Sequence, residues 1–203
     1  MISVYQIKPA FQNLLRPACG GLVALGVTAN AVTVFALLVS LAVGACIAVW
    51  PAEHWPLLLL PVALFLRMAL NAIDGMIARE FDMQSRLGAL LNEMGDVLSD
   101  AALYLPLGLL AGVSARWMTI IVVLAMATEL IGVLATSIGA ERRYDGPMGK
   151  SDRALVLGAF ALVLGLGVTR GAWITWFLVA IVAALVLTIL QRGRRALVNG
   201  GKR

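Results

Sequence analysis

Long apolar runs separated by short polar segments divide the chain into six stretches. A helix needs about 20 residues to cross about 30 Å of hydrocarbon, and most of these runs approach that length. The runs are continuous rather than alternating, which disfavours a barrel, because backbone in lipid closes its hydrogen bonds within helices or a sealed sheet. We therefore predict an all-α integral membrane protein whose six transmembrane helices lie at about residues 31–50, 56–78, 88–112, 117–139, 153–169 and 171–191.

The segment before the first apolar run has a different pattern. Residues 1–17 carry apolar side chains at helical spacing with basic and amide side chains between them. This pattern is typical of an amphipathic helix that lies in the membrane surface. We expect Pro17, Gly20 and Gly21 to break this helix before the first span, because proline and glycine disfavour helix interiors. Residues 1–203 would then form a single membrane domain.

Composition and charge indicate the membrane and the orientation in it. The chain is 61% hydrophobic and 13% charged, and its net charge is +5. With the N-terminus inside, nearly all Lys and Arg residues fall on the cytoplasmic side, and only Arg116 and Arg170 lie outside. We therefore predict a multi-pass protein of a bacterial inner membrane with both termini cytoplasmic. Its positive collar, with Arg192, Arg194 and Arg195 as solvated anchors, would attract anionic lipid headgroups and requires no nucleic-acid partner.

Cysteine and histidine are too scarce to carry the chemistry of the protein. Cys19 and Cys46 are too few for a disulfide framework and lack the spacing of a zinc site. His54 is the only histidine, which excludes a histidine-based catalyst or a histidine metal cage. Any metal site must therefore be built from oxygen ligands.

The second and third predicted spans each carry a polar stripe along one helical face. At 100° per residue, the polar face of the second span comprises Arg67, Asn71, Asp74, Gly75, Ala78 and Arg79. The corresponding face of the third span comprises Gly88, Asn92, Glu93, Gly95, Asp96, Ser99 and Asp100. A charge at membrane depth costs at least about 2.5–3.5 kcal/mol, so these stripes must face inward rather than toward lipid. We expect a cleft that opens to the cytoplasm and has carboxylates at its floor.

Carboxylates that converge from two helices repel each other, and a bound cation relieves the repulsion. Oxygen ligands without histidine or cysteine favour Mg²⁺, Mn²⁺ or Ca²⁺ over zinc. At the mouth of the cleft, the side chains of Arg79, Arg86, Lys150 and Arg153 suit phosphate groups. Carboxylates, a divalent metal and a basic rim together indicate phosphoryl-type transfer, in which positioning and charge neutralisation supply most of the catalysis.

The polar stripes also contain a known motif. Residues 71–96 resemble the signature D-x2-D-G-x2-A-R-x8-G-x3-D-x3-D of the CDP-alcohol phosphatidyltransferases at every spacing, and six of its eight positions are identical. The two departures are Asn71 and Asn92, which stand where that family has aspartate. The segments VTANAVT before the first span and GPMGKSDR before the fifth also resemble elements of the family.

The resemblance implies transfer of a phosphatidyl or similar phospho-group from a CDP-linked lipid or alcohol to a hydroxyl acceptor, with release of CMP, in phospholipid biosynthesis. In the family the four aspartates bind two divalent ions, Mg²⁺ or Mn²⁺, and the last of them, which corresponds to Asp96, is the general base. The implied metal ligands are Asn71, Asp74, Asn92 and Asp96, with Asp100 as a further candidate. The implied donor-binding residues are Asp74, Gly75, Ala78, Arg79, Ser85, Arg86 and Gly88, and the acceptor-binding residues are Lys150 and Arg153. The family also implies a homodimer, and the basic rim favours an anionic acceptor.

The sequence leaves several alternatives open. Asn71 and Asn92 either ligate a metal or hydrogen-bond to neighbouring helices, and their lost charges allow a protein that binds nucleotide or lipid without turnover. Asp100 either adds charge to the metal site or pairs with Arg67. Arg67 and Glu129 are expected to pair with other buried charges. A transporter or channel with an ion path along Arg67, Asp100 and Glu129 is a third hypothesis, which the apolar outer half of the third span disfavours.

Overall fold

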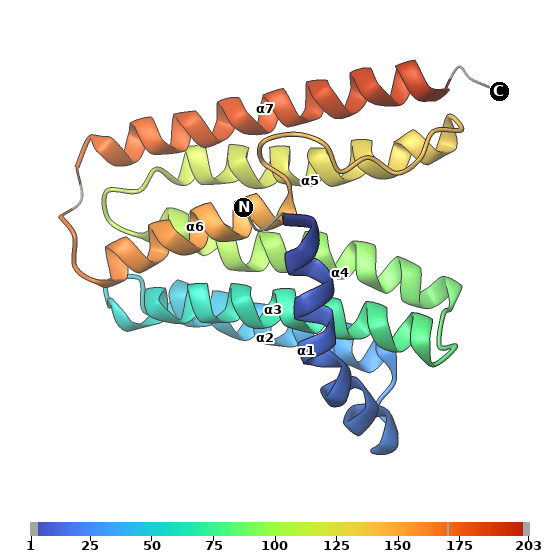
Figure 1. Ribbon diagram of the computed structural model, residues 1–203. Helices are drawn as coiled ribbons and strands as arrows, with labels where there is room; N and C mark the ends of the chain where they lie inside the picture. Colours follow the sequence, from blue (N-terminus) through green and yellow to red (C-terminus); the bar gives the residue numbers. More distant parts are fainter. Residues whose placement is uncertain (1–3, 170, 201–203) are drawn as a thin grey trace.

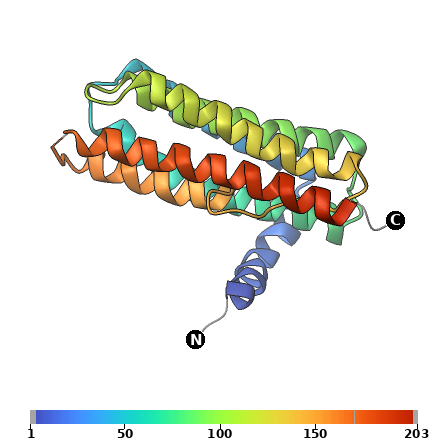
Figure 2. The ribbon, with the colours of Figure 1, turned by 90° about the horizontal axis from the view of Figure 1, so that it is seen from above.

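The computed structural model describes residues 4–169 and 171–200, and its elements are all helical. Figure 1 shows them in chain order, and Figure 2 shows the same bundle from above. The helices are α1 (Val4–Ala24), α2 (Ala29–Val49), α3 (Trp55–Glu80), α4 (Arg86–Tyr104), the 3₁₀ helix η1 (Leu105–Leu109), α5 (Ala115–Ser137), α6 (Lys150–Gly165) and α7 (Trp173–Gly200). The prediction of an all-α protein is confirmed.

Helices α2 to α7 lie side by side in a bundle, and α1 crosses it at a steep angle (Figures 1 and 2). Helix α2 packs against α3 and α4, α3 packs against α6, and α5 packs against α7. A continuous apolar core joins these pairs, and its fully buried side chains include Leu57, Leu60, Leu107, Leu157 and Leu178. The polar groups described below therefore lie within a bundle that apolar packing already holds together.

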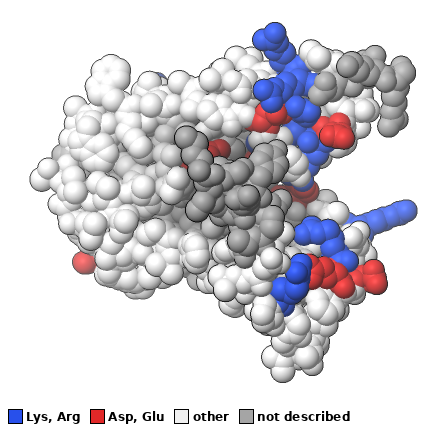
Figure 3. Space-filling model, in the orientation of Figure 1, with Lys and Arg blue, Asp and Glu red and all other residues white. Residues whose placement is uncertain are grey.

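The structure has the helices of a membrane protein. Among the described residues, α2, α3, α5 and α7 are long and apolar enough to cross a membrane. Helix α4 carries four charged residues, and α6 is only 16 residues long, yet both lie in the bundle beside these four helices (Figure 1). In Figure 3 the charged side chains gather at one end of the molecule, and most of the remaining surface on that face is uncharged.

The expected break at Pro17, Gly20 and Gly21 is wrong, because α1 continues through all three residues. Proline removes one backbone donor, but here both the proline and the residue whose carbonyl it leaves free lie in an exposed part of the helix. The second half of α1 packs on α2 and α3 through Cys19, which is fully buried. The chain leaves the helix only at Gly26, whose φ of +81° permits the left-handed turn of a Schellman motif.

The predicted third span is not one continuous α-helix. Helix α4 ends at Tyr104 and continues as η1, because Pro106 lacks the N–H that would bond to the carbonyl of Ala102. Helix α2 approaches this carbonyl at Gly44, where a Cβ atom would overlap the Ala102 oxygen. Glycine is therefore required where α2 crosses the end of α4.

The segment between α5 and α6, called the α5–α6 segment below, folds back along the bundle, so that α6 begins near the middle of its neighbours (Figure 1). Arg192 of α7 holds this segment and is only 2% exposed. Its Nε donates to the carbonyl of Asp145 at 2.9 Å, and its Nη1 donates to the carbonyl of Thr128 at 2.5 Å. The N–H of Met148 donates to Thr188 Oγ1 at 3.0 Å. The expectation that Arg192 is a solvated anchor is wrong, because buried carbonyl groups need donors and this guanidinium provides them.

Candidate functional site

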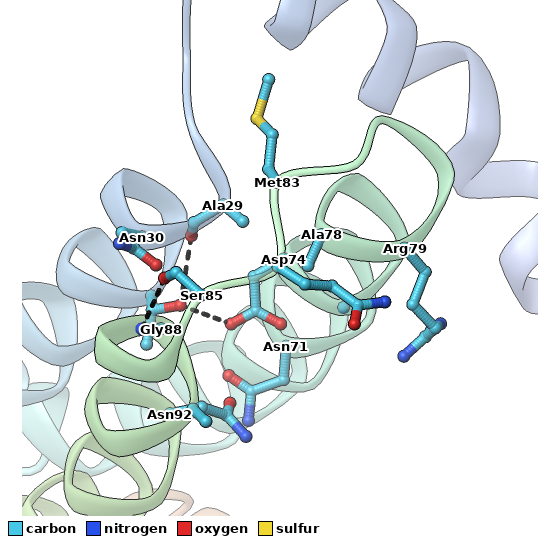
Figure 4. Close-up of a pocket in the computed structure, with 14 residues that line it drawn as sticks. Ala29, Asn30, Asn71, Asp74, Ala78, Arg79, Met83, Ser85, Gly88 and Asn92 are labelled. Atoms are coloured by element: carbon cyan, nitrogen blue, oxygen red, sulfur yellow. Dashed lines mark hydrogen bonds between the residues drawn. The ribbon is translucent and has the colours of Figure 1, made fainter.

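A cavity of about 440 Å³ lies between α2, α3 and α4. Figure 4 shows its polar lining, in which Asn71, Asp74 and Asn92 point toward one another from α3 and α4. The structure thus brings together most of the predicted donor-binding and metal-binding residues. The lining comprises Ala29, Asn30, Thr33, Asn71, Asp74, Gly75, Ala78, Arg79, Met83, Gln84, Ser85, Gly88, Ala89 and Asn92.

Two helix N-termini meet at the cavity. Ser85 is the N-cap of α4, and its hydroxyl accepts a hydrogen bond of 2.9 Å from the N–H of Gly88. Thr28 caps α2 in the same way by accepting from the N–H of Ala31 at 3.2 Å. The remaining N–H groups in the first turn of a helix, together with the positive end of its dipole, favour anions such as phosphate. The mouth of the cavity therefore suits a diphosphate.

Asp74 is the buried carboxylate of this cavity. It is 6% exposed and accepts a hydrogen bond of 2.8 Å from the hydroxyl of Thr33 on α2. In the described part of the chain, no Lys or Arg side chain forms an ion pair with it. A buried carboxylate without a cationic partner is costly, so the position of Asp74 favours a bound cation.

The motif glycines keep the cavity open for polar groups. A Cβ atom on Gly88 would lie 2.7 Å from Asn30 Oδ1 and 3.0 Å from Ser85 Oγ. A Cβ atom on Gly75 would lie 3.2 Å from Nη1 of Arg79, which places that guanidinium directly over the backbone of α3. Both glycines therefore make room for side chains that line the cavity, in addition to any role in helix packing.

Asp96, one turn beyond Asn92 on α4, lies beside the cavity rather than in its lining. Its Oδ1 accepts a hydrogen bond of 2.9 Å from the amide of Asn71, lies 3.4 Å from Nη2 of Arg67 and forms an ion pair with Lys150. None of these contacts involves its second oxygen, Oδ2. The side chain is 16% exposed, so Asp96 is held in one orientation with one oxygen left for another group.

A second cavity, of about 170 Å³, lies between α3 and α6. Asn71 lines both cavities, and Lys150 and Arg67 line this one. Asn71 therefore lies between the two cavities, and its amide contacts Asp96, which pairs with Lys150. A group bound on the α6 side would meet the ammonium of Lys150 and lie near Asp96.

Asp100 belongs to a buried ion network that Arg67 shares with Asp96. Its Oδ1 lies 2.5 Å from Nη1 of Arg67, and its Oδ2 accepts from Arg153 at 2.9 Å and 3.1 Å. Arg153 is 1% exposed and also donates to Glu129 and to the hydroxyl of Thr128, both at 2.9 Å. The expected pairing of Arg67 and Glu129 with buried charges is confirmed. The network joins α3, α4, α5 and α6.

The remaining predicted site residues lie apart from the cavity. Arg86 is exposed at the start of α4 and is absent from the lining. The guanidinium of Arg153 donates its hydrogen bonds within the ion network around Asp100. Thr33 and Asn30 were not predicted as site residues, although the segment VTANAVT that carries them resembled a family element. Their role depends on how α2 packs against α3 and α4, which helical periodicity does not specify.

The oxygen groups around Asp74 fit a divalent metal ion. In the described residues, no three His, Cys, Asp or Glu side chains converge as a metal cluster. The carboxylate of Asp74 and the amides of Asn71 and Asn92 nevertheless face one another (Figure 4). Such an all-oxygen set suits Mg²⁺ or Mn²⁺, which also keep water or phosphate ligands. The arrangement is thus able to hold a cation next to a diphosphate, with an oriented carboxylate on the other side.

Comparisons with known proteins agree with this geometry. A family model described as CDP-alcohol phosphatidyltransferase matches residues 26–190. Inner membrane protein YnbA of Escherichia coli is 45% identical over 199 residues, which are 97% of each chain. The phosphatidylinositol phosphate synthase of Mycobacterium tuberculosis, in complex with manganese and citrate, has a similar fold, with a TM-score of 0.75 and 22% identity over 91% of this chain and 90% of that one. The structure of the same synthase with CDP-DAG bound also matches with a TM-score of 0.75, and the match covers 91% of this chain and 94% of the synthase chain.

The family match extends over both helices of the motif and over α2, α5 and α6. The relative at 45% identity spans nearly the whole chain, so the likeness is not limited to a short motif. This protein belongs to the CDP-alcohol phosphatidyltransferase family.

Proposed function

We propose that this protein transfers a phosphatidyl or similar phospho-group from a CDP-linked donor to an alcohol, with release of CMP. One observation carries the proposal: Asp74 of α3 faces a cavity bounded by two helix N-termini, and Asn71 links that cavity to the oriented carboxylate of Asp96 on α4. A phospho-group transfer needs a site for the diphosphate on one side and a base on the other. These two parts lie side by side here.

The donor would bind in the cavity between α2, α3 and α4. The guanidinium of Arg79 and the N–H groups of the first turn of α4 would bind the diphosphate, for which Gly75 and Gly88 leave room. Asp74, with the amide oxygens of Asn71 and Asn92, would hold a Mg²⁺ or Mn²⁺ ion, which supplies charge neutralisation for the diphosphate and the leaving CMP.

The acceptor would bind in the cavity between α3 and α6. The Lys150 ammonium there suits an anionic alcohol, such as one that carries a phosphate. Asp96 Oδ2 would take the hydroxyl proton while the hydroxyl oxygen attacks the lipid-side phosphorus and the bond from that phosphorus to CMP breaks. Asn71 and Lys150 fix Asp96 through Oδ1, so that the free oxygen keeps one orientation.

We further propose that six helices cross a bacterial inner membrane and that both termini are cytoplasmic. The charged end of the molecule supports this orientation, and α7 carries Arg194 and Arg195 beyond its apolar part. The cavity for the donor then opens to the cytoplasm, where CMP is released. A homodimer is part of the proposal and is checked by cross-linking in membranes.

Purified protein in lipid nanodiscs provides the direct test. With CDP-diacylglycerol, Mn²⁺ and a panel of free and phosphorylated polyols, we expect CMP release that requires both the metal and one class of alcohol. The Asp96→Asn variant is the matched control, because it keeps the size of the side chain and removes the base. If this variant released CMP as fast as the wild type, the proposed mechanism would be contradicted.

A second candidate function is binding of a nucleotide or lipid without turnover. The observation in its favour is that Asn71 donates its amide to Asp96, so that this motif position offers Asp96 a hydrogen bond in place of a further carboxylate for metal binding. Tight binding of CDP with no CMP release for any alcohol would support this function. Recovery of CMP release in the double variant Asn71→Asp, Asn92→Asp would then identify an enzyme that has lost turnover.

A further inference from the structure

The two motif aspartates have different electrostatic surroundings. Asp74 faces the 440 Å³ cavity and has no ion-pair partner among the described Lys and Arg residues. Asp96 receives both the amide of Asn71, at 2.9 Å, and the ammonium of Lys150. One carboxylate is therefore available to an external cation, and the other already has a cation from the protein itself.

The two asparagines reduce the negative charge that cations must balance. Aspartate at positions 71 and 92 would give the motif four negative charges, which two divalent ions neutralise. Of the four acidic positions of the motif, only those of Asp74 and Asp96 carry a charge in this chain, and the ammonium of Lys150 cancels one of these two charges. A single divalent ion is then enough to make the site net positive for a diphosphate. A second ion would add two further positive charges within a few ångströms, which is strongly unfavourable.

The orientation of Asn71 leads to the same conclusion. A carboxylate only accepts hydrogen bonds, so the group of Asn71 that contacts Asp96 is its NH₂. An NH₂ group cannot coordinate a cation, so Asn71 offers no ligand to an ion on the Asp96 side. The oxygen of Asn71 lies on the side of Asp74 (Figure 4), where it adds a ligand to that carboxylate.

The fold fixes the position of Lys150. It is the first residue of α6, and the preceding Gly149 N–H donates to Asp152 Oδ2 at 3.0 Å. Arg192 holds the α5–α6 segment that leads into it. The guanidinium of Arg67 adds to this charge, because its Nη2 lies 3.4 Å from Asp96 Oδ1 while its Nη1 pairs with Asp100. The packing of the bundle thus holds the ammonium of Lys150 beside Asp96.

We infer that the ammonium of Lys150 takes the place of a second metal ion, and that the site binds a single divalent cation at Asp74. The inference rests on the proposed metal-dependent function, but the number of bound ions and the turnover are measured separately.

The first test counts Mn²⁺ ions bound to the full-length protein in nanodiscs of zwitterionic lipid, from the electron paramagnetic resonance signal of free Mn²⁺. We expect one ion per chain, and either two ions or none would overturn the inference. CMP release by the same samples reports on the proposed function independently. One bound ion without CMP release would support the inference and contradict the proposed function. Two bound ions with CMP release would contradict the inference and support the proposed function.

A matched pair of variants locates the ion. Asp74→Asn and Asp96→Asn make the same chemical change on facing helices. We expect Asp74→Asn to weaken Mn²⁺ binding by about 100-fold. We expect Asp96→Asn to change it by less than about tenfold, because Lys150 already balances that charge. Equal losses in the two variants would contradict a single site at Asp74.

A combined variant tests the role of the ammonium. Lys150→Met with Asn71→Asp and Asn92→Asp restores four carboxylates and removes the ammonium beside Asp96. We expect this protein to bind two Mn²⁺ ions per chain, whereas one ion in the folded variant would overturn the inference. Thermal denaturation with and without Mn²⁺ measures whether the variant is folded. If it is unfolded, the inference is tested by the ion count of the wild type and by the Asp74→Asn and Asp96→Asn pair.

Discussion

The amide of Asn71 on α3 donates a hydrogen bond of 2.9 Å to the carboxylate of Asp96 on α4. This contact joins the two helices of the motif beside the two cavities that Asn71 lines. Aspartate at position 71 would place two carboxylates where the structure has a donor and an acceptor. The asparagine therefore has a structural consequence in addition to its effect on metal binding.

We expect Asn71→Asp to make the stability of the protein dependent on metal. Loss of the hydrogen bond and the added repulsion would destabilise the fold by about 1–3 kcal/mol in EDTA, and Mn²⁺ would restore it. Thermal denaturation in EDTA and in Mn²⁺ measures the difference. Asn92→Asp is the matched control, because no hydrogen bond from the Asn92 side chain to Asp96 is present. An unchanged melting temperature of Asn71→Asp in EDTA would contradict the role of the contact.

The proposed general base, Asp96, should be removable without loss of CDP binding. We expect Asp96→Asn to lower the rate of CMP release by about 10²–10⁴-fold, which is the typical contribution of a positioned base. CDP binding, measured by equilibrium dialysis, should change little, because Asp96 lies outside the lining of the donor cavity. A parallel loss of CDP affinity would show that Asp96 acts in donor binding instead.

Gly88 should be more sensitive to a methyl group than Gly95, although both lie on α4. The Cβ of Gly88→Ala would lie 2.7 Å from Asn30 Oδ1, whereas that of Gly95→Ala would make an ordinary contact of 3.6 Å with Thr33 Cγ2. Overpacking costs about 1–3 kcal/mol, so we expect CDP affinity to fall by roughly 5- to 150-fold in Gly88→Ala. Affinity in Gly95→Ala should stay near that of the wild type. Equal affinities in the two variants would contradict the cavity described here.

The buried ion network should respond strongly to the loss of one member. Arg153→Met leaves Asp100 and Glu129 with fewer partners, and breaking a buried pair costs about 3–5 kcal/mol. We expect a large fall in melting temperature relative to Arg194→Met, which replaces an exposed arginine near the end of α7. Similar melting temperatures for the two variants would show that the network contributes little.

The α5–α6 segment should open only at strongly acidic pH. Burial raises the pKa of Asp145, but hydrogen bonds from Arg143 and Arg195 outweigh burial and hold this pKa below its ordinary value of 3.8. Because the folded pKa is the lower one, the stabilisation is complete above the unfolded value and is lost as pH falls through the folded value. We expect the rate of pepsin cleavage in this segment to rise only well below pH 3.8 in the wild type.

The control for this pH dependence is Asp145→Asn, which keeps the shape of the side chain and removes its charge. We expect its segment to be cleaved faster than that of the wild type already at neutral pH by a protease active there, with no further change tied to Asp145 on acidification. Wild-type cleavage that rises between pH 7 and pH 5 would point to a different titrating group.

Much of the site follows from the sequence, because helical periodicity fixes which side chains share a face. Asp74, Gly75 and Arg79 are on one stripe of α3, and Gly88 and Asn92 are on one stripe of α4, wherever these helices pack. Charges at membrane depth must face inward, so the meeting of the two stripes also follows. The all-α class and the membrane setting follow from the length of the apolar runs.

Only the tertiary structure determines which partner each charged or polar side chain contacts. The sequence predicts Arg153 as an acceptor-binding residue and Arg192 as a solvated anchor, yet both are buried, with Arg153 on Asp100 and Arg192 on backbone carbonyls. Thr33 reaches Asp74 across 41 positions in sequence, and Lys150 reaches Asp96 only because the α5–α6 segment folds back into the bundle. Periodicity determines the face of a helix, but the partner on that face depends on packing between segments distant in sequence, which no local pattern encodes.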